Sequence, residues 1–271
     1  MKARVTRRPL RSTGVALALL LVLAAVVLGI WRPWAPLPSA APIGAGSDGE
    51  AAAPAAVVPA PLVLPEHPRV LVFGDSWTFG SAATLPTEGY AYQLAGLLDG
   101  ETVVRGVRGS GYLKPGLDGP AFGERIAALD PALSPDLVIL QGSINDRKQG
   151  EAGYREAVTA AWDALAATYP EAAIVILGPA PHALPVEAGT ARIDADLAEL
   201  AAMRGWWYIS PLAQDWITEQ NYLEVIDVEV GRRHPSTAGH RYLAEKVAAA
   251  LAEMSGAPVT VAGESETTPE Q

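Results

Sequence analysis

The chain has 271 residues, of which 49% are hydrophobic, a formal net charge of -10 and no cysteine. The absence of cysteine excludes thiol catalysis, cysteine-bound zinc and iron–sulfur clusters. The acidic composition argues against a nucleic-acid partner, because binding phosphates requires a basic face.

The amino-terminal segment predicts a membrane anchor. Residues 1–13 form a basic segment, and the 18 residues of the following segment, 14–31, carry no charge. At about 1.5 Å per residue, a helix of this length just crosses the bilayer core. The preceding positive charges predict a cytoplasmic amino terminus and a single-pass protein of the cell membrane with an extracytoplasmic domain. A cleaved signal peptide, which would leave a secreted protein, is the alternative.

Composition also marks the limits of the folded domain. Residues 32–66 contain eight prolines and many alanines, which predicts an extended Pro/Ala-rich linker. Residues 255–271 are polar and acidic, and we expect them to form a disordered tail. The folded domain is therefore expected over residues 67–254.

Within this domain, short apolar runs alternate with helical patterns. The runs are typical of strands buried on both faces. Their alternation with helices predicts an α/β fold in which helices cover both faces of a central parallel sheet, with functional loops at the carboxyl ends of the strands. The expected strands are Arg69–Phe73, Thr102–Val107, Asp136–Gln141, Ala173–Gly178 and Trp206–Ile209, and the expected helices are about 88–98, 121–129, 151–168, 188–204 and 237–253.

The first two expected strands lead into glycine-containing turns. The first is followed by Gly74-Asp75-Ser76-Trp77, where backbone N–H groups at the start of a turn can stabilise negative charge beside Ser76. A simple helix cap by Asp75 or Ser76 is the alternative. The second strand is followed by Gly106–Tyr112, whose glycines allow the backbone to approach a ligand closely.

Two later segments add polar side chains at the same predicted edge. Asn145 follows the third strand and can donate a hydrogen bond into the crevice, although Asn-Asp also favours turns and caps. His234 precedes the last helix, and an unperturbed imidazole pKa of about 6.5 suits it to accept a proton from a serine hydroxyl. His182 is expected to serve its loop, and His240 the start of the last helix.

In this order, the segments resemble the SGNH hydrolases, also called GDSL-type esterases and lipases. The resemblance spans most of residues 69–250. It rests on Gly-Asp-Ser-Trp at 74–77, the glycine at 109, Gly-x-x-Asn-Asp at 142–146, and His-Pro with Gly-His at 234–240. It implies a three-layer α/β/α flavodoxin-like fold and no metal or organic cofactor.

The resemblance also implies roles for individual residues. Ser76 is the nucleophile and His234 the general base. The oxyanion hole consists of the backbone N–H groups of Ser76 and Gly109 and the side chain of Asn145, with Gly111 as the alternative to Gly109.

One position departs from the family pattern. The family usually has an aspartate three residues before the catalytic histidine, where this chain has Gly231. Asp227 could fill that role from a longer loop, and otherwise a backbone carbonyl could orient His234. The adjacent Arg232 and Arg233 could bind an anionic substrate group or be solvated loop charges.

The expected function is that of a serine esterase that hydrolyses carboxylic esters outside the cytoplasm through a Ser-His-Asp acyl-enzyme mechanism. An acetylated glycan or a lipid is the expected substrate. The alternatives are an O-acyltransferase of the same fold acting on envelope polysaccharide, and a non-catalytic envelope binding domain. The presence of Ser76, Asn145 and His234 argues against the last.

Overall fold

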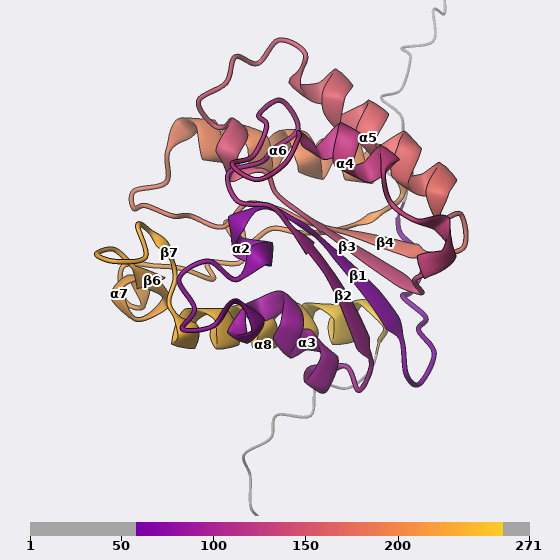
Figure 1. The fold of residues 1–271 in the computed structure, drawn as a ribbon, viewed down its shortest axis with the longest axis horizontal. Helices are drawn as coiled ribbons and strands as arrows, with labels where there is room; N and C mark the ends of the chain where they lie inside the picture. Colours follow the sequence, from indigo (N-terminus) through magenta and orange to yellow (C-terminus); the bar gives the residue numbers. More distant parts are fainter. Residues whose placement is uncertain (1–57, 257–271) are drawn as a thin grey trace, which may run out of the picture. The chain divides into compact units, whose positions relative to one another are not determined.

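A computed structural model describes residues 58–256 and shows a parallel five-stranded sheet (Figure 1). The sheet has the order β2-β1-β3-β4-β5, so the chain moves to one side of β1 and then to the other. The carboxyl ends of β1 and β3 therefore flank the switch point at which such sheets bind ligands. The strands are β1 (Arg69–Gly74), β2 (Glu101–Gly106), β3 (Leu137–Gln141), β4 (Ala173–Leu177) and β5 (Trp207–Ile209).

Helices cover both faces of the sheet, as the alternating pattern predicts. On one side, α3 (Tyr90–Leu97) and α8 (Thr237–Met254) pack over alternate strand residues that include Val70 and Val72. On the other side, α4 (Phe122–Ala127), α5 (Tyr154–Thr168) and α6 (Ala188–Arg204) pack over residues that include Leu71 and Phe73 (Figure 1). The inner strands β1, β3 and β4 are thus buried on both faces along most of their length, which explains their largely apolar sequences.

The remaining elements are short and lie mostly at the carboxyl edge of the sheet. They are α2 (Ser76–Phe79), α7 (Tyr222–Val225), β6 (Ile226–Asp227), β7 (His234–Pro235) and 3₁₀ turns at Pro86–Glu88, Pro131–Leu133 and Ile144–Asp146. Strands β6 and β7 pair antiparallel, with Asp227 opposite His234. Apart from the turn or capped helix expected at Ser76, these elements were not expected from the sequence, because none is long enough to show a hydrophobic period.

The folded domain begins earlier than residue 67. Leu62 is only 4% exposed within the core on the α3/α8 face, and its backbone N–H donates to Met254 O at 3.0 Å. The Trp207 indole N–H donates to Ala60 O at 3.0 Å. The predicted linker boundary at residue 66 is therefore wrong, because proline-rich sequence can still pack an isolated leucine into a core.

The predicted anchor at 14–31, the first part of the predicted linker and most of the predicted tail lie outside the described residues. Within residues 58–256, no helix combines the length and the apolar character that crossing a membrane requires.

Candidate active site

The turn between β1 and α2 holds Ser76 at the carboxyl edge of the sheet. Gly74 lies so close to α2 and to the end of β3 that a Cβ there would collide with Thr78 Oγ1 and Gln141 Oε1. The Asp75 side chain caps α2 by accepting the Trp77 backbone N–H at 2.9 Å. These contacts fix Ser76 as the first helical residue, with its side chain largely buried.

The structure brings Ser76 and His234 together from positions 158 residues apart. His234 Nε2 lies 2.9 Å from Ser76 Oγ, and His234 Nδ1 lies 2.8 Å from Gly231 O. Because a carbonyl oxygen only accepts hydrogen bonds, Nδ1 must carry the proton in the neutral ring. Nε2 is then unprotonated and faces the serine hydroxyl, which is the arrangement that a general base requires.

Asp227 lies beside this pair without bonding to the imidazole. Its Oδ1 accepts the Glu229 backbone N–H at 3.0 Å, while His234 Nδ1 points to the Gly231 carbonyl. The predicted Asp227–His234 pair is therefore not formed. A Cβ at Gly231 would lie 2.8 Å from Asp227 Cγ, so the space where a side chain at position 231 would begin is already occupied by Asp227.

Backbone donors face the same edge from the loop after β2. Gly109 has a φ of +74°, which favours glycine, and its N–H and that of Ser76 have no protein acceptor within the described part of the chain. The Gly111 N–H, in contrast, donates to Lys114 O at 2.8 Å. This difference favours Gly109 over Gly111 as the donor that remains available to a substrate.

The 3₁₀ turn after β3 carries Asn145 to the loops that contain Ser76 and Gly109. Asn145 Nδ2 lies 3.0 Å from Ser110 O and 3.3 Å from Asp75 Oδ2. The amide therefore bridges the two loops that carry the backbone donors. The structure thus brings all four residues of the predicted serine, histidine and oxyanion set to one edge of the sheet.

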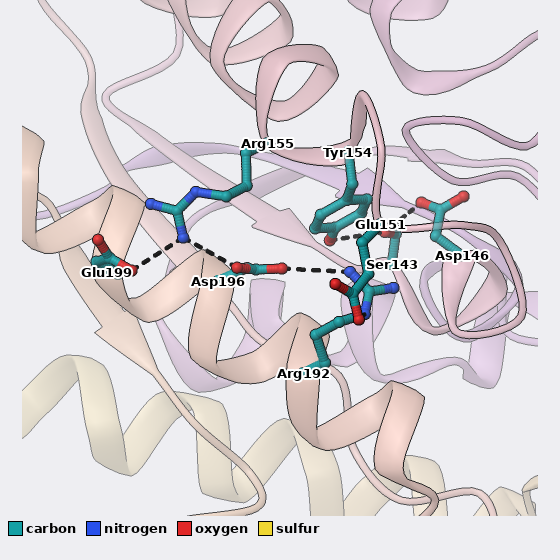
Figure 2. A network of polar contacts seen from close by, with 8 residues as sticks. All are labelled: Ser143, Asp146, Glu151, Tyr154, Arg155, Arg192, Asp196 and Glu199. Carbon is teal, nitrogen blue, oxygen red and sulfur yellow. Dashed lines mark hydrogen bonds and ion pairs between the residues drawn. The ribbon is translucent and has the colours of Figure 1, made fainter. Parts of the chain in front are cut away.

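Asp146 fixes the position of this turn from beneath. The carboxylate is buried, accepts the backbone N–H groups of residues 112–114 at 2.7 to 3.2 Å, and accepts the Ser143 hydroxyl at 2.6 Å. Figure 2 shows that Tyr154 also contacts Ser143, and that polar contacts continue beyond it to the ion pairs of α5 and α6. Asp146 therefore joins the loop after β2 to the turn that carries Asn145.

Burial shifts the pKa values of three groups around the site. Desolvation raises the pKa of Asp75 to about 7, despite the Trp77 backbone hydrogen bond. Desolvation lowers the pKa of His240 to about 4, and it lowers that of His182 to about 4 with help from the positive charge of Arg147. Both of these imidazoles are therefore neutral at pH 7.

The two histidines that the sequence analysis left outside the catalytic set form hydrogen bonds that connect neighbouring segments. His240 accepts the Tyr90 N–H at Nδ1 and donates to Ser81 O from Nε2 at 3.0 Å. His182 Nε2 lies 3.1 Å from an Arg147 nitrogen. Within residues 58–256, no three His, Asp or Glu side chains gather as a metal site would need.

The aromatic residues flanking the predicted crevice belong to the core. Trp77 and Tyr112 are each 5% exposed, and the Tyr112 hydroxyl accepts the Trp162 indole N–H at 2.6 Å. Sequence reasoning missed Gln141 and Arg125, which contact the loops of the site. The sequence offers no local signal for either, because their contacts depend on tertiary packing.

The chain is similar in sequence to known proteins. Residues 72–242 match the model of the GDSL-like lipase/acylhydrolase family. The chain is 28% identical over 194 residues to the GDSL lipase Rv0518 of Mycobacterium tuberculosis, covering 66% of this chain and 79% of the relative.

Two solved structures share the fold. A lipolytic protein of the G-D-S-L family from Desulfitobacterium hafniense aligns with a TM-score of 0.55 at 18% identity, over 67% of this chain and 98% of the other. A family two carbohydrate esterase from Clostridium thermocellum, in complex with cellohexaose, aligns with a TM-score of 0.55 at 18% identity, over 72% of this chain and 67% of the other.

Proposed function

Because the chain belongs to the GDSL-like lipase/acylhydrolase family and is a carboxylic ester hydrolase, we propose that Ser76 is its nucleophile and His234 its general base. The observation that carries this proposal is the 2.9 Å contact between Ser76 Oγ and His234 Nε2, with Nδ1 held on a carbonyl. A non-catalytic binding domain has no need of this aligned pair.

The first half of the reaction forms an acyl-enzyme. Ser76 Oγ attacks the ester carbonyl carbon while its proton moves to His234 Nε2. The tetrahedral intermediate collapses, the bond to the leaving oxygen breaks, and the imidazolium returns the proton to that oxygen. An alcohol leaves, and the acyl group remains on Ser76.

The second half repeats the sequence with water. His234 Nε2 takes a proton from water as the water oxygen attacks the acyl carbon. Collapse releases the carboxylic acid and returns the proton to Ser76 Oγ. Over the full cycle, one ester and one water are consumed, and one acid and one alcohol are formed.

Three donors support the negative oxygen of both intermediates. In the proposal these are the backbone N–H groups of Ser76 and Gly109 and the amide of Asn145. Removing one such donor typically lowers kcat by about 100- to 1,000-fold. In this structure the Asn145 amide nitrogen lies 3.0 Å from Ser110 O and 3.3 Å from Asp75 Oδ2, so one of these two contacts must be released when the amide donates to the oxyanion.

A carbonyl in place of a carboxylate orients the base. Gly231 O fixes the tautomer of His234, as an aspartate does in a triad, but offers a dipole instead of a full charge to the imidazolium. We therefore propose a Ser-His dyad, with the neighbouring Asp227 carboxylate acting through space.

The substrate and its location are further parts of the proposal. An acetylated glycan outside the cytoplasm is supported by the apolar segment at 14–31 and by the likeness to a carbohydrate esterase. The contacts of Ala60 and Leu62 lie at the amino ends of the strands, opposite the catalytic edge.

Hydrolysis of p-nitrophenyl acetate by the full chain tests the catalytic proposal. Ser76→Ala removes the nucleophile and should abolish turnover, while Ser255→Ala, at the exposed end of α8, should leave it unchanged. Equal rates from Ser76→Ala and the unaltered chain would exclude Ser76 as the nucleophile. Release of acetate from acetylated glycans, compared with transfer to an added polysaccharide, separates hydrolase from acyltransferase.

A further inference from the structure

Arg125 projects from α4 beneath the loops of the catalytic edge. Its guanidinium is partly buried and stacks over the Phe73 ring at 4.2 Å, with the Phe122 ring also near at 5.4 Å. The two rings meet edge to face at 5.2 Å. The guanidinium is therefore held by packing and cannot turn freely toward solvent.

The same guanidinium donates to three separate segments. Nη1 donates to Gly74 O at 2.9 Å and to Ser110 Oγ at 2.8 Å, and Nη2 donates to Arg105 O. Gly74 O closes β1 just before Ser76, and Arg105 O lies near the end of β2. Arg125 thus joins the ends of two neighbouring strands to the loop that follows the second.

Two of these three acceptors, Gly74 O and Ser110 Oγ, lie close in sequence to a proposed oxyanion donor. Gly74 immediately precedes the Asp75-Ser76 turn, and Ser110 immediately follows Gly109. Ser110 O in turn accepts the Asn145 side-chain amide at 3.0 Å. The guanidinium thus contacts the segments that carry Ser76 and Gly109 directly, and it is linked to Asn145 through Ser110.

We infer that Arg125 is a positioning residue that sets the spacing of the three oxyanion donors. This inference rests on the proposed function. Arginine suits the task because its planar fork reaches several acceptors at once, whereas a lysine ammonium is a compact point charge on a flexible stem. Since misplacement by about 1 Å can lower a rate by about 100-fold, small loop shifts are sufficient to matter.

Arg125→Met and Arg125→Lys test this role in the full chain with p-nitrophenyl acetate. Both variants should lower kcat by about 10- to 100-fold with less than about a threefold change in KM, because the donors act on the transition state. Arg204→Met is the matched control, because Arg204 also stacks on two aromatic rings and pairs with a carboxylate, away from the catalytic loops. It should lower the melting temperature without lowering kcat.

A double substitution identifies the route by which Arg125 acts. If Arg125 acts through the oxyanion hole, adding Arg125→Met to Asn145→Ala should lower kcat by less than the product of the two separate effects. Ser110→Ala, which removes only one acceptor, should show a smaller loss of kcat and keeps the test available if Arg125→Met does not fold.

The two possible failures are distinguishable. A folded Arg125→Met variant with unaltered kcat, or effects that multiply fully with Asn145→Ala, would overturn the positioning role. If Ser76→Ala abolished activity in the same series, the catalytic proposal would still stand. Activity retained in Ser76→Ala would instead overturn the catalytic proposal itself.

Discussion

At the scale of single residues, the sequence predicts the nucleophile and the base better than it predicts the group that orients the base. Ser76 and Asn145 each follow a strand and His234 shortly precedes the last helix, so a pattern of short motifs finds them. The group that orients His234 is a backbone carbonyl, and any residue supplies one. The sequence therefore leaves a backbone carbonyl as the alternative to Asp227 without identifying which one, and the structure shows that it is the carbonyl of Gly231.

The Asp227→Asn variant measures how much the carboxylate beside His234 contributes to catalysis. The substitution removes a charge that does not contact the imidazole, so we expect kcat/KM for p-nitrophenyl acetate to fall by less than about tenfold. A triad aspartate changed to asparagine costs about 10,000-fold, because the histidine then adopts the wrong tautomer. Glu229→Gln serves as the control for the neighbouring charge. A fall in kcat/KM of about 10,000-fold, as in a triad, would mean that Asp227 orients His234 during the reaction.

Arg125 illustrates the residues that sequence reasoning cannot find. It lies on the α4 face directed at the sheet, within a helix that the sequence does predict. Its partners are two strand-end carbonyls and a hydroxyl from segments up to 51 residues away. Such partners become visible only when the register of the strands is known.

At the scale of elements, length decides what the sequence predicts. All five strands of the sheet and the five longest helices lie within a few residues of their expected positions, because each buries a continuous or periodic apolar surface. The elements that hold the catalytic groups, α2, β6 and β7, have two to four residues. Their geometry comes from caps and turns that no hydrophobic period marks.

Helix α8 provides a pH-dependent contribution to stability through His240. The buried neutral imidazole joins Ser81 O to the Tyr90 N–H, and its pKa is lowered to about 4 by burial. Between about pH 6.5 and 4 the unfolded chain binds a proton that the folded chain excludes, so this contribution is present above pH 6.5 and is lost as the pH falls. Its full size is about 3 kcal/mol.

A comparison of urea unfolding for the unaltered chain and His240→Gln isolates this effect. The comparison is needed because burial raises the pKa of Asp75 to about 7, which changes stability in the opposite direction over the same pH range. The free-energy difference between the two proteins should shrink as the pH falls from 6.5 to 4. A difference that stays constant with pH would reject the protonation argument.

At the scale of the whole molecule, the proposed catalytic groups and the first described residues of the domain lie at opposite edges of the sheet. The carboxyl edge of the sheet carries the proposed catalytic groups, and residues 59–63 line a surface at the opposite edge with residues 171–174 and 205–207. The parallel sheet and its two helical layers were predictable from the alternation of elements. The packing of the proline-rich segment against the domain was not predictable, because the composition of the whole segment resembles that of a linker.

Leu62→Ala tests whether this segment belongs to the folded domain. Leu62 is buried in the core, so its truncation should lower the free energy of unfolding by about 2–5 kcal/mol. Val63→Ala is a close control, because Val63 is 84% exposed and should change stability little. Urea unfolding measures both. Equal stability of the two variants would show that residues before 67 contribute nothing to the fold.

The central claim is that His234 activates Ser76 for covalent chemistry. The most direct measurement is mass spectrometry of peptides after reaction with a fluorophosphonate, which phosphonylates an activated serine and releases fluoride. The account predicts a stoichiometric adduct on the peptide containing Ser76 and a reaction at least about 1,000-fold slower in His234→Ala. An adduct on another serine, or an unchanged rate in His234→Ala, would contradict it.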